Sequence, residues 1–227
     1  MPPPAYLRGL VEHTFVEYAG GPTEWRVVPD SSPHLMATVL DGGRLRAALV
    51  GARSRAAIID RRERIATVGI RLLPGALAVI VKDSAREFLD CAVPLADAFP
   101  AGLLTHLEIS ADAPPSHIVA ELLRLVRRAA SAPAVPCASL AERATRERSH
   151  REIGLSPKRA MRIQRLHRAL WAARPRTLSW ATIAHSSGYA DQAHLTRECR
   201  SLLGDTPVQW LARGSADLFK TAIRPTD

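Results

Sequence analysis

Short apolar runs separated by turn signals dominate the first 75 residues of the chain. The runs are rich in Val, Ile, Leu and Thr, and segments such as Asp41-Gly42-Gly43 and Pro74-Gly75 lie between them. Several short strands joined by tight turns predict an antiparallel barrel or sandwich. The predicted strands cover residues 24–29, 34–40, 45–51, 56–60 and 65–72.

Helical periodicity replaces this pattern further along the chain. A short helix is expected at about residues 84–91 and a longer one at about 116–130. Ser116 suits the N-cap of the longer helix, and one apolar stripe follows it. The stripe consists of Ile118, Leu122, Leu125 and Val126. Such a stripe packs either on its own domain or against a second copy of the chain.

A segment of small residues and prolines, SAPAVPCAS at residues 131–139, is typical of a linker. We therefore expect a domain at residues 1–130, the linker at 131–139, a second domain at 140–213 and a tail at 214–227. The predicted class is α+β, with a mainly-β first domain with flanking helices and an all-α second domain.

The second domain begins with a strong helix signal. Ser156-Pro157 combines a favoured N-cap with proline at the first helical position, and the helix should continue to about Ala173. Its buried side is marked by Ile163, Leu166 and Leu170. Its basic residues lie largely elsewhere on the helix: Lys158, Arg159, Arg162 and Arg165.

Two further helices and a glycine turn carry the functional prediction. Residues 178–186 suit a short helix with Ile183 and Ala184 facing inward, and Gly188 permits a left-handed turn under which Tyr189 can pack. Asp191 is a natural N-cap for a helix that ends near Gly204. The core expected for this unit is Ile183, Ala184, Gly188, Tyr189, Leu195 and Cys199.

This arrangement predicts a helix-turn-helix whose second helix enters the major groove of DNA. Gln192, His194, Arg197 and Arg200 fall largely outside its apolar face. Glutamine can pair with adenine, and arginine with guanine. The alternative is a helical hairpin with an accidental polar face.

The charge distribution along the chain also favours a DNA-binding C-terminal part. Residues 1–130 carry a net charge of +1 and residues 131–227 a net charge of +8. A basic domain attached to a near-neutral one suggests a polyanionic partner, although a solvated arginine-rich surface would give the same count.

Motifs for catalysis are missing from the sequence. It has no GxSxG, HExxH, GxxxxGK[ST] or GxGxxG pattern, and His13, His34, His106 and His117 are scattered without an HxH pair. Cys91, Cys137 and Cys199 are too far apart for a CxxC site and are expected to be small buried hydrophobes. We expect no enzymatic activity, metal or cofactor. With no signal peptide or membrane-spanning run, a cytoplasmic protein is expected.

The runs GLSPKRAMRIQRLHRAL (residues 154–170) and IAHSSGYADQAHLTRECRSLLGDTP (residues 183–207) resemble the AraC/XylS family of bacterial transcription regulators. The residues that carry the second resemblance are Ala184, Gly188, Tyr189, Asp191, Gln192, Leu195, Arg197, Gly204 and Pro207. The family implies two helix-turn-helix units joined by the long helix that starts at Pro157.

The resemblance also implies roles for individual residues. The residues matched to base-facing positions are Gln192, Ala193, His194 and Arg197. Those expected to hold phosphates are Arg200, Lys158, Arg159, Arg162 and Arg165. Cys199 departs from the pattern because an aromatic core residue is usual there, so this corner is either looser or filled by larger neighbours. The first unit, at residues 140–154, is short by about five residues, so base reading is assigned to residues 191–203 alone.

The N-terminal part resembles the cupin-like domains of some of these regulators, through Gly69 to Gly75 and Val93-Pro94-Leu95. This resemblance implies a sensor or dimerisation domain, with a small-molecule effector and a homodimer as candidate partners beside double-stranded DNA and RNA polymerase. No membrane partner is expected. Two alternatives stay open: a degraded regulator that binds DNA weakly and acts through a partner, and a small cupin-type enzyme with a DNA-targeting module.

Overall fold

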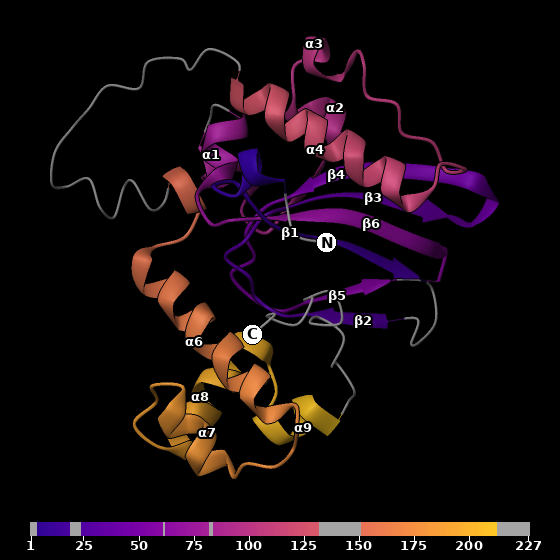
Figure 1. Ribbon diagram of the computed structural model, residues 1–227. Coiled ribbons are helices and arrows are strands. Elements are labelled where there is room, and N and C mark those ends of the chain that lie inside the picture. The colour runs from indigo at the N-terminus through magenta and orange to yellow at the C-terminus, as the bar shows by residue number, and fades with distance from the viewer. Residues whose placement is uncertain (1–3, 19–23, 61, 82–83, 132–150, 213–227) are drawn as a thin grey trace, which may run out of the picture.

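The computed structural model describes residues 4–18, 24–60, 62–81, 84–131 and 151–212. Its N-terminal part is built on a five-stranded antiparallel sheet with strand order β1-β6-β3-β4-β7 (Figure 1). These strands are β1 (Val11–Tyr18), β3 (His34–Leu40), β4 (Arg44–Val50), β6 (Arg64–Leu72) and β7 (Ala92–Pro94). The β3–β4 hairpin closes through the 3-10 turn Asp41–Gly43, where Gly42 and Gly43 adopt positive φ.

A separate two-stranded ribbon, β2 (Glu24–Val27) and β5 (Ala57–Asp60), lies on one side of this sheet (Figure 1). The expected α+β class is confirmed, and all five predicted strands are present. The described strands do not close into a barrel. They pair into two sheets that share no hydrogen-bonded ladder. The physical reason is that β1 and β7 are the edges of the larger sheet and do not pair with each other or with the ribbon.

The opposite face of the sheet is covered by α4 (Pro115–Ser131) (Figure 1). The predicted stripe of Ile118, Leu122, Leu125 and Val126 is buried in one cluster with sheet residues such as Leu35 and Ile70. Because these side chains fill the core of their own domain, they are not available to a second copy of the chain.

Smaller elements complete this domain. They are η1 (Ala5–Leu7), α1 (Ala76–Val81), η3 (Ala85–Phe88), α2 (Leu95–Ala98) and α3 (Ala101–Leu104). The short helix expected at 84–91 is the 3-10 turn η3, capped by Ser84, whose side chain accepts from the Arg86 N–H. Cys91 is exposed, so the expectation of a buried cysteine is wrong there, whereas Cys199 is buried.

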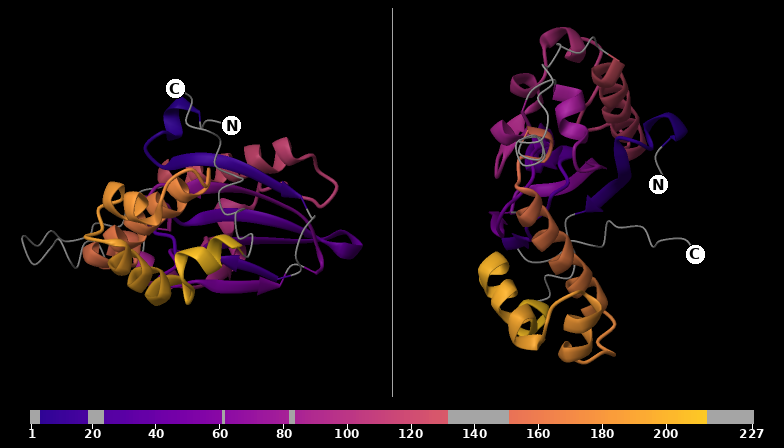
Figure 2. Two further views of the ribbon diagram at one scale, coloured as in Figure 1. Left: turned by 90° about the horizontal axis from the view of Figure 1, so that it is seen from below. Right: turned by 90° about the vertical axis from the view of Figure 1, so that its left-hand side faces the viewer.

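The C-terminal part is helical, as predicted. Its elements are α6 (Pro157–Ala173), α7 (Trp180–Ser186), α8 (Gln192–Leu203) and α9 (Pro207–Ala212). Figure 2 shows α6 leading away from the sheets to the other three helices, which gather at one end of the molecule. Ser156 caps α6 as expected, accepting from the Arg159 N–H. The linker and most of the short first unit, at residues 132–150, lie outside the described residues. Within the described part, no helix is both long and apolar enough to cross a membrane.

Candidate DNA interface

The turn between α7 and α8 is fixed by local hydrogen bonds. The Ser179 hydroxyl caps α7 by accepting from the Thr182 N–H at 3.1 Å. Gly188 adopts φ +82°, a left-handed conformation that lets the chain leave α7 without side-chain strain. The Asp191 carboxylate then accepts from the His194 N–H at 2.6 Å and starts α8. The helices α7 and α8, joined by this glycine turn, form a helix-turn-helix.

A common apolar core holds the two helices together. Five of the six residues expected there are buried: Ile183, Ala184, Tyr189, Leu195 and Cys199. Gly188 is exposed, so its expected place in the core is wrong, and it serves the unit through its backbone.

Cys199 is fully buried in a cluster that also contains large side chains. Trp210 of α9 is 1% exposed and belongs to the same buried cluster, which also takes in Val28 of the N-terminal domain. Burial, with a smaller effect of Glu198, raises the pKa of Cys199 to about 12. The thiol therefore stays protonated near neutral pH and behaves as a small core side chain.

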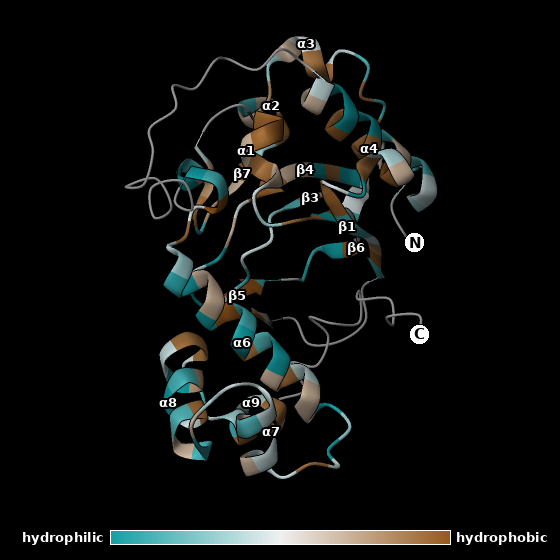
Figure 3. Ribbon diagram, turned by 60° about the vertical axis from the view of Figure 1, so that its left-hand side comes forward, coloured by the Kyte–Doolittle hydropathy of each residue, from teal (hydrophilic) through white to brown (hydrophobic). Residues whose placement is uncertain are grey.

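The outer side of α8 presents polar and basic groups. Gln192, Ala193, Arg197 and Arg200 are exposed, and Figure 3 shows this helix as largely hydrophilic on its outer side. Among the described residues, no hydrogen bond or ion pair engages the side chains of Arg197 and Arg200. These two guanidinium groups are thus free to meet a polyanion.

His194 differs from its neighbours on α8 because its ring is used within the turn. The ring packs edge-on against Tyr189 with 5.2 Å between centroids, and its Nδ1 accepts from the Ala190 N–H at 3.4 Å. The side chain is only partly exposed. It stabilises the start of the helix, in addition to any contact with DNA.

The four residues of α6 that are predicted to hold phosphates divide into two groups. Lys158 is exposed, whereas three arginines contact the protein itself. Arg159 donates to the Ser54 carbonyl at 2.6 Å, and Arg165 donates to the Gly188 carbonyl at 3.1 Å. Arg162 forms a bidentate ion pair with Glu198 of α8. Sequence reasoning missed these contacts because the partners lie 23 to 105 residues away along the chain.

The Arg162–Glu198 pair fixes how α6 and α8 lie against each other. The hydrogen bond that Arg162 donates to Glu198 is the main cause that raises the pKa of Arg162, with partial burial acting in the opposite direction. Arg162 also donates to the Ser201 hydroxyl at 3.2 Å. Its predicted phosphate contact would have to compete with this pair.

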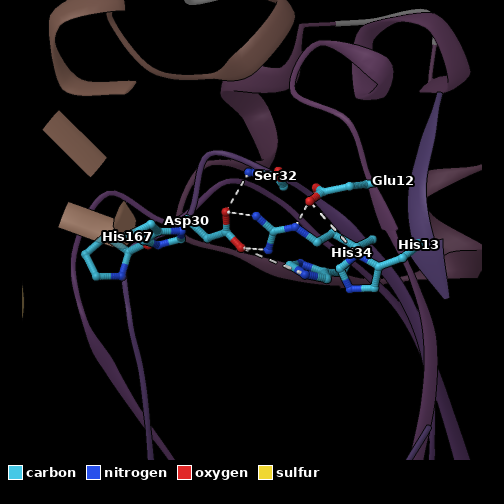
Figure 4. Close-up of polar contacts among 8 residues, drawn as sticks. Glu12, His13, Asp30, Ser32, His34 and His167 are labelled. Carbon is cyan, nitrogen blue, oxygen red and sulfur yellow. Dashed lines mark hydrogen bonds and ion pairs between the residues drawn. The ribbon is translucent and has the colours of Figure 1, made fainter. Parts of the chain in front are cut away.

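A second polar cluster lies between the sheet and α6 (Figure 4). The Arg71 guanidinium contacts both carboxylate oxygens of Asp30 and donates to Glu12 at 2.7 Å. His34 and His13 lie beside this pair, at neighbouring positions of the sheet. Two histidines that are scattered in the sequence are thus close together. Even so, the described residues include no group of three or more His, Cys, Asp or Glu side chains arranged to hold a metal ion.

The electrostatics of this cluster favour neutral histidines. Burial, assisted by the positive charge of Arg71, lowers the pKa of His34 to about 3, and burial also lowers the pKa of His13. For Asp30, burial alone would raise the pKa, but Arg71, His167 and His34 outweigh it and the pKa is lowered. The ion pair therefore consists of ionised Asp30 and Arg71 beside the uncharged imidazoles of His34 and His13.

This cluster predicts a loss of stability in mild acid. A histidine with a lowered folded-state pKa binds its proton mainly in the unfolded state, so its contribution is complete above about pH 6.5 and falls towards its folded pKa. Between pH 6.5 and 4, the free energy of unfolding of wild type should fall more steeply than that of His34→Gln, by up to about 1.4 kcal/mol per pH unit. Urea denaturation at several pH values measures this. Parallel curves for the two proteins would contradict it.

Two family models match parts of the chain. Residues 137–213 match a family model described as a helix-turn-helix domain, and residues 1–94 match a model described as a domain of unknown function (DUF6597). No curated protein matches the chain. Among solved structures, the 1.65 Å structure of ToxT from Vibrio cholerae is similar, with 8% identity and a TM-score of 0.39 over 88% of this chain and 97% of that chain.

Residues 137–213 are therefore a helix-turn-helix domain of the AraC type, and the resemblance to AraC/XylS regulators is confirmed. The chain is a DNA-binding transcription regulator that joins this domain to an N-terminal domain of the DUF6597 type.

Proposed function

We propose that the chain binds duplex DNA sequence-specifically by placing the outer face of α8 in the major groove. The observation that carries this proposal is the pair of exposed arginines, Arg197 and Arg200, which have no partner within the described residues. Gln192 and Ala193 lie in the first turn of the same helix, and this turn is the part that reaches base edges in helix-turn-helix proteins. His194 contributes both to the turn and to base reading in this proposal.

The phosphate contacts follow from the same exposure pattern. Arg200 and Lys158 are the members of the predicted set whose charges are exposed and unpaired among the described residues. Arg159, Arg162 and Arg165 stay in the proposed set as groups that would exchange an internal partner for a phosphate. Each such exchange costs the internal contact, so we expect these three to contribute less than Arg200.

Selection of bound duplexes from a random library tests the proposal. A single enriched motif of about four to six base pairs is expected from one complete reading unit. Replacing Arg197 by Ala should weaken binding to the best site by about 1–3 kcal/mol and relax the preference at one base pair. Arg200→Ala is the matched control. It should weaken all duplexes alike and reduce the salt dependence by about one counterion. Uniform weakening by Arg197→Ala would remove that residue from the base-reading set.

The N-terminal domain is proposed to be regulatory. Its candidate functions are binding of a small-molecule effector, formation of a homodimer and contact with RNA polymerase. Because the apolar stripe of α4 is buried in its own domain, a dimer would have to use another surface. A regulator of this kind acts on DNA in the bacterial cytoplasm, and no catalysis is proposed. Stoichiometric metal in the purified protein would revive the enzyme alternative.

A further inference from the structure

One backbone hydrogen bond joins the two domains at the end of α8. The Ala56 N–H, from the loop before β5, donates to the Leu202 carbonyl at 3.0 Å. Leu202 lies in the last turn of α8, where the carbonyls have no intrahelical donor. The N-terminal domain therefore supplies a cap for the helix that is proposed to read DNA.

The same region of the N-terminal domain also holds α6. Arg159 donates to the Ser54 carbonyl at 2.6 Å, and His167 donates through Nε2 to the Pro29 carbonyl at 2.6 Å. Ala52 is buried in one cluster with Leu155, Ala160 and Ile163. Val28 is buried in the core of the helix-turn-helix unit itself. We call residues 28–30 and 52–56 the docking platform.

The docking platform is anchored to the sheet. Asp30 and Arg53 exchange two backbone hydrogen bonds of 2.9 and 2.7 Å, and Asp30 is held by Arg71 of β6. The Ser54 N–H and hydroxyl both donate to the Asp90 carboxylate, at 2.8 and 2.7 Å. Gly51 lies so close to the Phe88 backbone that an added Cβ would stand 1.9 Å from its carbonyl oxygen. These contacts make the docking platform a firm support for α6 and α8.

The docking platform contacts α8 away from the surface that is proposed to read DNA. The docking platform contacts α8 at its C-terminal end, whereas Gln192, Ala193 and Arg197 at the other end and on the outer face stay exposed. A contact that covered the reading face would inhibit DNA binding, but this one leaves it open. Pre-ordering a binding element lowers the entropy cost of binding and so favours affinity.

We propose that the docking platform positions α8 for DNA reading, so that the N-terminal domain is part of the DNA-reading machinery. The inference rests on the proposed function. Ala56, through its N–H, and His167 are positioning residues: they act through α8 and α6 and touch no DNA.

Two variants test the positioning role of the docking platform, and each removes a different contact between the domains. Ala56→Pro removes the N–H that caps Leu202, and Ala56→Ser is its matched control because it keeps the N–H. His167→Leu removes the donor to Pro29. With folding verified by circular dichroism, Ala56→Pro and His167→Leu should each weaken binding to the selected duplex by roughly three- to tenfold, as expected for one net hydrogen bond. Ala56→Ser should bind like wild type.

The salt dependence distinguishes positioning from phosphate contact. Neither variant removes a phosphate contact, so the slope of log affinity against log salt should be unchanged. Arg159→Gln is informative for the same reason: loss of a phosphate contact would reduce the slope by about one, whereas loss of the Ser54 contact alone would weaken binding at constant slope.

Hydrogen exchange gives a readout that needs no DNA. The Ala56 amide should be protected in wild type and should exchange faster in folded His167→Leu. Wild-type affinity in both folded variants, or an unprotected Ala56 amide in wild type, would overturn the positioning proposal alone. Failure of the wild-type protein to select any duplex would overturn the proposed function and, with it, this inference.

Discussion

Replacing Arg71 by methionine is expected to lower the free energy of unfolding by about 3–5 kcal/mol, the usual result of removing one partner of a buried ion pair. Arg71 and Asp30 are 19% and 12% exposed, and the Arg71 guanidinium contacts both oxygens of the Asp30 carboxylate. Methionine preserves much of the side-chain volume, so the effect reports the lost charge partner of buried Asp30 and, to a smaller extent, of the more exposed Glu12. Urea denaturation at pH 7 measures it.

A double variant separates the charge from the packing. Asp30→Asn combined with Arg71→Met removes both charges, while the asparagine oxygen can still accept from the Ser32 N–H as the carboxylate does at 3.0 Å. The double variant should recover a large part of the loss, because no buried ion remains unpaired. Additive destabilisation by the two substitutions would show that the charge pairing is not the cause.

The Arg71→Met protein should also respond differently to acid. Without the guanidinium, burial is the main influence left on Asp30 and raises its pKa above the unfolded-state value, so on acidification the folded state binds a proton before the unfolded state does. The stability difference from wild type should therefore shrink as the pH falls from neutral towards about 4, because the folded variant binds the proton before the unfolded chain does. It should shrink further below about 4, where wild type loses the contribution of its ionised Asp30. A constant difference would contradict this sign.

Replacing Leu195 by alanine should cost about 2–5 kcal/mol, the range for deleting a large buried side chain and leaving a cavity. Leu195 is 1% exposed and is packed in the cluster that joins α6, α7, α8 and α9. We expect the unit to loosen or unfold and DNA binding to be lost with it. Thermal unfolding, followed by the fluorescence of buried Trp210, provides the measurement.

Leu178→Ala is the matched control because it makes the same change of side chain in the same unit, but at a position that is 48% exposed. Its effect should stay within about 0.5 kcal/mol, as is usual for surface positions. A Leu195→Ala protein with a normal melt and altered base preference would show that Leu195 contacts DNA rather than the core.

The elements that the sequence predicts well are those whose ends are set by local chemistry. Ser156 before Pro157 begins α6, Asp191 begins α8 and Gly204 ends it in a left-handed conformation, each through contacts within a few residues. The apolar stripe of α8 likewise follows from its own period. For this reason the amino-acid sequence alone is enough to locate the helix-turn-helix and its exposed face.

The elements that escaped prediction lack such local signals. β1 has a register irregularity between Val11 and His13, so its apolar and polar positions do not alternate cleanly. β7 has three residues, α9 has six, and the helices α1 to α3 have four to six. Segments this short are stable only when packed against a larger body, which propensity cannot reveal.

By itself, the sequence determined the class of this protein and the helix that is proposed to read DNA, because a helix-turn-helix is specified by caps, a turn glycine and one apolar stripe. The tertiary structure decided which arginines are free: Arg197 stays exposed, whereas Arg162 is paired with Glu198. It also decided that Asp30 and Arg71 meet and that Ala56 caps Leu202. These contacts join residues 36 to 146 positions apart in the chain, and no local pattern encodes such distances.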